Sequence, residues 1–169
     1  SALRITLGQA VSRGERMDYT LQKAVELGVQ HIQPLDSERS LARLDPARQE
    51  KKLRHWQEIV RAAAEQSGRE RVPEVQPLRS LAKWVQNLPV DSRKLLLDPQ
   101  TETRLAALSP TADICLLSGP EGGLSEAEVR FALSAGFVGI RLGPRILRTE
   151  TAAVACLAAL QTLWGDLGQ

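Results

Sequence analysis

The sequence predicts an α/β fold, in which helices flank a mostly parallel sheet. Two observations support this class. Strand-like and helix-like segments alternate along the 169 residues, and the spacing of apolar residues changes accordingly between a period of two and a helical period. No internal repeat, low-complexity stretch or linker interrupts the alternation. We therefore expect residues 1–169 to form one domain.

The first elements alternate strand, helix and strand. Residues 3–7 alternate apolar and polar side chains, as a strand does, and residues 31–35 form a second short strand. Between them, residues 15–27 carry apolar side chains at helical spacing, and Gly28 supplies a left-handed stop.

A long helix is expected next. Asp45 is a suitable N-cap, and Pro46 fits the first helical position because its missing N–H has no partner there. Trp56 falls on the apolar stripe of this helix, which predicts a core residue rather than a base-stacking platform. His55 is expected to be a partly exposed helix residue, and Gly68 ends the helix.

The remaining segments complete the alternation. They are, in order, an extended piece at 72–75, a short helix around 81–85, strands at 94–97 and 114–117, a helix that begins at a Ser125/Glu128 capping box and closes at Gly136, a strand at 137–142, a loop at 143–148 and an Ala- and Leu-rich helix at 149–164.

Composition and charge predict a cytoplasmic protein. The chain is 43% hydrophobic and 25% charged, and its net charge of +2 indicates no partner by itself. No apolar run approaches the roughly 18 residues of a membrane span, and the N-terminus lacks the apolar stretch of a signal peptide. Cys115 and Cys156 lie in apolar segments, so we expect buried, reduced thiols. Because the chain opens directly on a strand-like segment, we expect it to be part of a longer protein.

Several enzyme classes lose support because their motifs are missing. The sequence contains no GxxxxGK[ST] phosphate loop, no GxGxxG fingerprint and no GxSxG nucleophile elbow. It also contains no HExxH or CxxC, so no metal site is expected. Its chemistry must then proceed without a metal or a covalent nucleophile.

Two glycine-bearing loops follow consecutive late strands: GPEGG at 119–123 and LGPRILR at 142–148. In open α/β sheets, ligands bind beyond the carboxyl ends of the strands, and glycine lets the backbone approach them closely. Both loops could instead be tight turns, and for GPEGG this alternative stays open. It fits LGPRILR less well, because a turn has no use for Arg145 and Arg148 beside Ile146 and Leu147.

The chain resembles a known enzyme family at this point. The string LLSGPEGGLSEAEV, followed by GFVGIRLGPRILRTETAAVACLAAL, is similar to the C-terminal signature of the 16S rRNA uracil-N3 methyltransferases, which belong to the SPOUT superfamily. The segments QKAVELGVQHIQPLDSERS at 22–40 and KKLRHWQEIVRAAAEQSGRERVPEV at 51–75 are similar as well, so the resemblance spans nearly the whole chain. It implies a C-terminal deep trefoil knot, a homodimer, and an N-terminal RNA-binding barrel domain that this sequence does not include.

The resemblance also implies that S-adenosylmethionine binds in the knot. The apolar walls of the adenine site would be Leu97, Leu142, Ile146 and Leu147, and backbone near Gly119, Gly143 and Leu147 would bond the adenine edge. The remaining expected cofactor contacts are Glu121, Gly122 and Arg148.

The implied reaction is an in-line methyl transfer to N3 of a uridine in 16S rRNA of the small ribosomal subunit. Uracil N3 carries a proton at neutral pH, so a base or a nearby positive charge must favour its anion. Arg148 is the first candidate to stabilise that charge, and Glu121 and Glu150 are candidates for the base or for orienting an arginine. Each glutamate could equally be a structural loop or helix-start carboxylate, and Glu150 falls in the first turn of a helix, where any acid is favoured.

RNA contacts are expected from a basic stretch. Residues 39–71 contain nine basic and five acidic side chains, a local excess of four that could also be the solvated face of a helix. With the resemblance, it becomes the expected phosphate-contacting surface. We favour Arg69, Arg71 and, from the late loop, Arg145.

Two other functions stay open. The chain could be a SPOUT RNA methyltransferase of another specificity, acting on a tRNA ribose or on guanine N1. It could also be a non-catalytic RNA-binding assembly factor that retains the fold.

Overall fold

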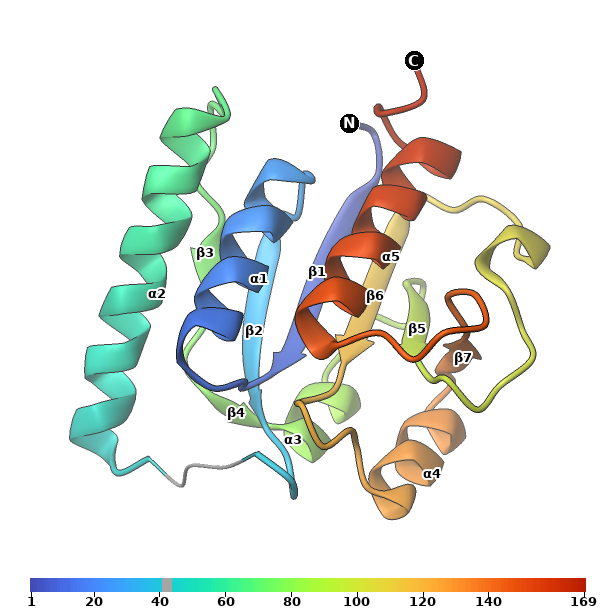
Figure 1. Ribbon diagram of the computed structural model, residues 1–169, viewed down its shortest axis with the longest axis horizontal. Helices are drawn as coiled ribbons and strands as arrows, with labels where there is room; N and C mark the ends of the chain where they lie inside the picture. The colour runs from blue at the N-terminus through green and yellow to red at the C-terminus, as the bar shows by residue number, and fades with distance from the viewer. Residues whose placement is uncertain (41–43) are drawn as a thin grey trace.

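A parallel sheet with helices on both faces forms the framework of the molecule in the computed structural model (Figure 1), which describes residues 1–40 and 44–169. Arg43, one of the nine basic residues counted above, lies outside the described residues. The elements are β1 (Arg4–Ala10), α1 (Gly14–Glu26), β2 (His31–Asp36), α2 (Pro46–Gln66), β3 (Glu74–Val75), β4 (Arg79–Ser80), α3 (Leu81–Gln86), β5 (Arg93–Leu97), a 3₁₀ turn (Leu105–Ala107), β6 (Asp113–Ser118), α4 (Glu126–Ser134), β7 (Val138–Ile140) and α5 (Thr149–Trp164).

The sheet has seven strands in the order β3-β2-β1-β6-β5-β7, and β4 pairs with the far end of β2. The registered strand pairs are all parallel, which confirms the predicted α/β class. Because the strands are parallel, their carboxyl ends face the same edge of the sheet. The central pair, β1 and β6, runs in register from Arg4 opposite Asp113 to Gln9 opposite Ser118.

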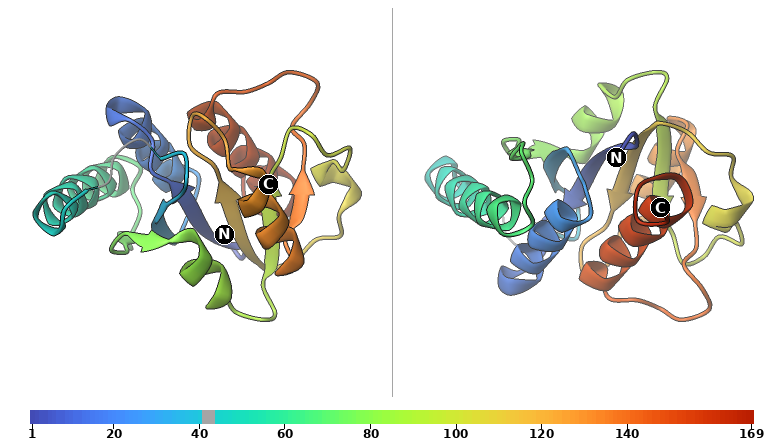
Figure 2. Two further views of the ribbon diagram at one scale, coloured as in Figure 1. Left: turned by 90° about the horizontal axis from the view of Figure 1, so that it is seen from below. Right: turned by 90° about the horizontal axis from the view of Figure 1, so that it is seen from above.

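Two apolar clusters, one on each face, hold the helices to the sheet. One cluster joins α1, α2 and α5 to the sheet, and the other joins α3 and α4. Figure 2 shows the two helix layers from below and from above. Strand β6 is covered on both faces, which explains its nearly continuous apolar run, whereas β1 alternates apolar with polar or small side chains. Close approach is needed at Gly8 in β1, where a Cβ would lie 2.3 Å from the Trp84 ring of α3.

The local helix signals are confirmed. The Asp45 carboxylate accepts from Arg48 N at 2.9 Å, Ser125 and Glu128 form a reciprocal capping box, and Gly28 has a φ of +82°. The predicted strand at 137–142 is shorter, at Val138–Ile140. Its last part leaves the sheet because Arg141 pairs with Arg104 of the segment after β5 instead.

Other predictions about single side chains can be checked in the same way. As predicted, Trp56 is 3% exposed in the core and His55 is an exposed helix residue. The bond between His55 and Asp18 was not predicted. Cys115 and Cys156 are buried and form no disulfide, also as predicted. Burial raises the pKa of the Cys156 thiol to about 12, which favours an unreactive, protonated sulfur.

Among the described helices, none combines the length and the apolar character that crossing a membrane requires.

Candidate functional site

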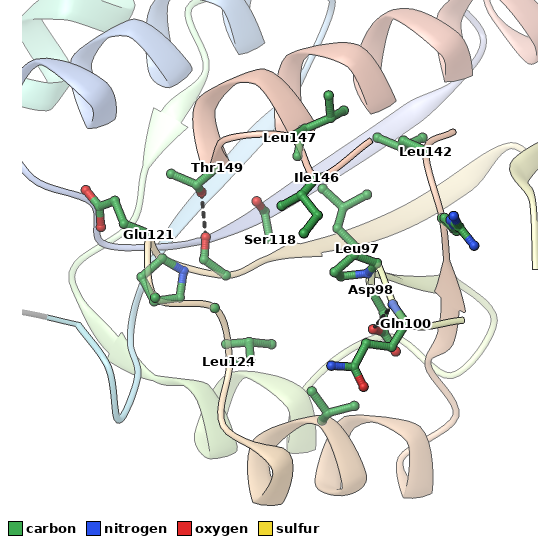
Figure 3. A pocket seen from close by; sticks show the side chains of 18 of the residues that line it. Leu97, Asp98, Gln100, Ser118, Glu121, Leu124, Leu142, Ile146, Leu147 and Thr149 are labelled. Carbon is green, nitrogen blue, oxygen red and sulfur yellow. Dashed lines mark hydrogen bonds between the residues drawn. The ribbon is translucent and has the colours of Figure 1, made fainter. Parts of the chain in front are cut away.

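Three neighbouring strands end beside a cavity at one edge of the sheet (Figure 3). The last residues of β5, β6 and β7, which are Leu97, Ser118 and Ile140, all line it. β5 pairs with both β6 and β7, so the loops that follow the three strands must converge. The cavity measures about 660 Å³, within the ~300–1,000 Å³ range of small-molecule sites.

One wall of the cavity is apolar. Leu97, Leu142, Ile146 and Leu147 lie together on the side of α5, and Leu124 faces them from across the cavity (Figure 3). The Ile146 side chain is 89% exposed in the protein alone. A ligand with a flat apolar surface would remove this side chain from water, which is favourable.

The loop at 119–123 is shaped by its glycines and by contacts to other elements. Gly123 has a φ of +76° and donates to Pro120 O at 2.9 Å, which closes a tight turn. The carbonyl of Gly119 accepts from Thr149 Oγ1 at 2.6 Å and from the buried Gln9 Nε2 at 3.3 Å. The loop is thereby tied to the first residue of α5 and to the end of β1.

The loop at 142–148 is held from the opposite side by Arg141. Its Nε donates to Gly143 O at 2.9 Å, its Nη1 lies 3.2 Å from a Glu102 carboxylate oxygen, and its backbone N–H donates to Thr103 O at 2.8 Å. Gly143 turns the chain with a φ of +71°. Both glycine loops therefore have defined positions around one shared cavity, as the sequence predicted.

The structure brings together most of the predicted cofactor contacts. The predicted cofactor contacts that line the cavity are Leu97, Gly119, Glu121, Gly122, Leu142, Ile146 and Leu147, and Arg145, which was predicted to contact RNA, lines it as well. Three predicted residues, Gly143, Arg148 and Glu150, are not part of its lining. Gly143 instead serves the turn, and Arg148 is the exposed N-cap residue of α5.

Glu121 lines the cavity, but its carboxylate is directed elsewhere. Oε1 accepts from Arg13 N at 2.7 Å and lies 3.6 Å from Nη1 of Arg16, at the start of α1. Figure 3 shows the carboxylate turned away from Leu124 and Asp98. Of the two roles predicted for Glu121, orienting an arginine fits this geometry better than acting as a base.

Glu150 is half-buried in the first turn of α5, where its Oε2 has no hydrogen-bond partner within the described part of the chain. Burying a carboxylate oxygen that accepts no hydrogen bond costs free energy, so this atom can still accept a bond from an additional donor. It does not face the cavity of the single chain, however, and its predicted catalytic role remains a prediction.

Arg69 and Arg71 lie at the opposite edge of the sheet from the cavity, ahead of β3. The Arg69 guanidinium donates to Val25 O at 3.0 Å and to Val29 O at 2.6 Å, so it caps the end of α1. Partial burial lowers its pKa. Arg71 is exposed. One guanidinium nitrogen of Arg69, Nη1, is thus used by the protein's own backbone, and the RNA contact of Arg69 stays a prediction.

Sequence reasoning missed several residues that line the cavity: Arg39, Asp98, Gln100, Ser118, Arg130 and Thr149. Asp98 and Ser118 could have been predicted from their positions, because they lie at the carboxyl ends of two expected strands, where ligands bind in such sheets. For Arg130 no local signal existed, since it looks like any charged residue on a helix.

The cavity does not have the composition of a metal centre. Nowhere in residues 1–40 and 44–169 do three His, Cys, Asp or Glu side chains gather closely enough to hold an ion.

Comparison with known proteins places this site in a family. The model of one family, described as an RNA methyltransferase domain, matches residues 1–161. The chain belongs to this RNA methyltransferase family. A curated relative from Buchnera aphidicola (strain APS), named ribosomal RNA small subunit methyltransferase E, is 36% identical over 167 residues, which are 98% of this chain and 66% of the relative. The chain thus spans about two thirds of the length of the curated relatives it matches.

Two solved structures resemble this RNA methyltransferase domain closely. One is ribosomal RNA small subunit methyltransferase E of Neisseria gonorrhoeae bound to S-adenosyl methionine, with a TM-score of 0.92, 48% identity, and coverage of 98% of this chain and 68% of that one. The other is a putative methyltransferase of Legionella pneumophila in complex with the same cofactor, with a TM-score of 0.93, 40% identity, and coverage of 98% and 69%.

Proposed function

We propose that this chain is the catalytic domain of an S-adenosylmethionine-dependent methyltransferase that modifies N3 of a uridine in 16S rRNA of the small ribosomal subunit. The observation that carries the proposal is the single cavity shared by the 119–123 and 142–148 loops. Relatives of this chain are named as small subunit rRNA methyltransferases, and two similar structures hold the cofactor. The resemblance of residues 22–40 and 51–75 to the uracil-N3 family supports the choice of target atom.

The residues of the cavity fit the cofactor. Leu97, Leu142, Ile146 and Leu147 would enclose the adenine, and the backbone at Gly119 would approach it closely. A Cβ on Gly119 would lie 3.1 Å from Leu124 N, so a larger residue here requires the loop to shift by a few tenths of an ångström. When bound, S-adenosylmethionine supplies an already activated methyl group. The protein's own work is therefore to align the substrate and to favour the N3 anion.

The proposed catalytic roles rest on three side chains. Arg148 would stabilise the negative charge that develops on the uracil oxygens, because it is exposed and immediately precedes Thr149 of the cavity wall. Glu121 would hold Arg16 and the start of α1 against the 119–123 loop. Glu150 is the remaining candidate for the base: its Oε2 has no partner among the described residues, but it does not line the cavity, so it would have to turn towards the substrate to act.

The proposal includes a deep trefoil knot in one SPOUT domain. In the segment after β5, Thr103 O accepts from the N–H of Arg141, the residue that follows β7, and Arg104 lies opposite Arg141 in an isolated bridge. The chain then turns back to α5, which packs on α1. Such a path is expected where the C-terminal segment threads beneath an earlier loop. Knots are rare, so this assignment depends on the family as much as on the path.

We also propose a homodimer that works in the cytoplasm on the small ribosomal subunit. Tyr19 of α1 and Leu163 of α5 are 46% and 50% exposed, and large apolar side chains on neighbouring helices favour association.

The test is to incubate the protein with S-adenosylmethionine and small ribosomal subunits that lack the modification, and then to map reverse-transcription stops on 16S rRNA. Methylation at N3 blocks base pairing, so we expect one new stop, 3′-adjacent to a uridine. A methylated ribose or guanine would instead support another SPOUT specificity. No methylation, together with no cofactor binding by calorimetry, would support the non-catalytic assembly factor.

A further inference from the structure

Two arginines that the sequence did not single out stand at the mouth of the cavity. Arg39 belongs to the segment after β2, and Arg130 belongs to α4. Both are exposed, and both line the cavity. α4 lies across the cavity from the apolar wall of Leu142, Ile146 and Leu147 (Figure 3). The cavity thus has an apolar side suited to a nucleoside and a side that carries arginines.

Arg39 is held in place by the protein. Its Nη1 donates to Gly122 O at 3.0 Å, and its aliphatic stem lies against Gly122, where an added Cβ would be 3.7 Å from Arg39 Cβ. The preceding residue, Glu38, donates its backbone N–H to Glu128 Oε2 of α4 at 3.2 Å. Glu128 is 8% exposed and also belongs to the capping box of α4. This bond fixes the segment of Arg39 to the helix that carries Arg130.

Among residues 1–40 and 44–169, no hydrogen bond is found for the remaining side-chain donors of Arg39 or for those of Arg130. Arg141, which also lines the cavity, is bonded to Gly143 and Glu102. By contrast, neither Arg39 nor Arg130 takes part in any of the ion pairs found across the described residues. The cavity also contains carboxylates, but Glu121 is engaged by Arg13 and Arg16, and Asp98 accepts from Gln100 N. Glu126, on α4, is the remaining acid.

We propose that Arg39 and Arg130 form a phosphate-binding subsite, which grips the RNA backbone beside the target nucleotide. This inference rests on the proposed function, because it assumes that an RNA base enters the cavity. The planar fork of a guanidinium matches two phosphate oxygens, and such contacts fix the register of a nucleic acid on a protein. A strand held at Arg39 and Arg130 approaches from the side opposite the apolar wall. Because Arg39 also bonds Gly122, the same residue connects the bound RNA to the 119–123 loop.

The test compares R39Q and R130Q with R4Q in the full chain. Arg4 is a matched control, since it is an exposed arginine at the other edge of the sheet, paired with Asp113. The measurements are kcat and KM for unmodified small ribosomal subunits, and the Kd for S-adenosylmethionine by calorimetry. We expect KM to rise about tenfold or more in R39Q and R130Q, as for a lost bond to a charged group, while cofactor Kd is unchanged. R4Q should match the wild type.

A second measurement separates failure of this inference from failure of the proposed function. The salt dependence of binding to the same subunits requires no catalysis, and each lost phosphate contact should reduce the slope of log K against log salt by about 0.7–0.9. R39K, which keeps the charge, should retain the slope even if the bond to Gly122 is lost. Thermal unfolding confirms that each variant folds; if R39Q does not fold, R39K and R130Q carry the test.

Two results would overturn the inference. One is an R39Q and an R130Q protein whose KM and salt slope equal those of R4Q. The other is an R39Q protein with weakened cofactor binding but unchanged RNA binding, which would make Arg39 only a brace for the 119–123 loop. The wild type could also bind subunits, with a salt slope that decreases in both R39Q and R130Q, and yet methylate nothing. That result would support the phosphate subsite and contradict the proposed reaction.

Discussion

The carboxylate of Glu121 shows how a contact decides the role of a residue. It accepts a hydrogen bond from the Arg13 N–H and forms an ion pair with Arg16, so its charge is already used in holding the start of α1. In E121Q the amide oxygen can still accept from Arg13. We therefore expect single-turnover methylation within about tenfold of the wild type, whereas loss of a general base would reduce it by ~10²–10⁴. Rapid-quench measurement of methyl transfer distinguishes the two.

The matched variant for this prediction is E121A. It removes the acceptor for Arg13 N–H as well, so it should weaken cofactor binding more than E121Q does. A drop of a hundredfold or more in E121Q, with cofactor affinity intact, would restore Glu121 as the base and contradict the orienting role.

Residue identities in the site were largely predictable, but side-chain directions were not. Leu97, Leu142 and Leu147 were expected from the resemblance to a family, and they line the cavity at the carboxyl ends of the strands, where a parallel sheet exposes its loops to ligands. Whether Glu121 faces the cavity or the start of α1 depends on Arg13, more than a hundred residues earlier. The sequence carries no local signal of that contact. The same holds for Arg69, whose guanidinium is bonded by two carbonyls near the end of α1.

At the scale of elements, α4 depends on its first turn. Ser125 Oγ accepts from Glu128 N at 3.1 Å, and the Glu128 carboxylate accepts from both Ser125 N and Glu38 N. We expect S125A to lower the free energy of unfolding by about 1 kcal/mol. E128A should lower it by about 1–3 kcal/mol, because two backbone donors are left without an acceptor. Urea unfolding followed by circular dichroism measures both changes.

Ser134, at the other end of α4, provides the control. Its hydroxyl donates to Phe131 O in an exposed position, so S134A should stay within about 0.5 kcal/mol of the wild type. Equal effects for S125A, E128A and S134A would show that the capping box does not stabilise the helix. E128A should also raise KM for RNA, as R39Q does, if the bond to Glu38 positions Arg39.

Elements with local signals were predictable, and those that depend on partners were not. α2 and α4 carry their own caps, at Asp45 and Ser125, so the sequence places their starts correctly. β4 has only two residues and exists because Arg79 and Ser80 reach the end of β2. β7 ends at Ile140 because the next residue, Arg141, donates its N–H to Thr103 O and lies opposite Arg104 in an isolated bridge, and both partners lie far away in sequence. Pairing of this kind is a property of the folded sheet, not of the segment.

At the scale of the molecule, the order of the strands creates the site. β5 lies between β6 and β7, so the loops from three segments meet although long stretches of chain separate them. Alternating strands and helices predict a parallel sheet but not its order, and the knot in particular could be expected only from the resemblance to a family. The shared cavity is therefore the feature that joins topology to function.

A shared cavity also implies that ligand binding stabilises the whole fold. A molecule that binds only the folded state stabilises it by about 2.7 kcal/mol at a concentration of 100 Kd. For a chain of 169 residues, each kcal/mol raises Tm by about 2–4 °C, so S-adenosylmethionine should raise it by about 5–10 °C. Free methionine, which lacks the adenosine that the apolar wall would enclose, should produce no shift at the same concentration. Differential scanning calorimetry measures both. If Tm is unaffected by the cofactor at concentrations far above the expected Kd, the two loops do not form its site, and the assignment of Leu97, Leu142, Ile146 and Leu147 to the adenine fails with it.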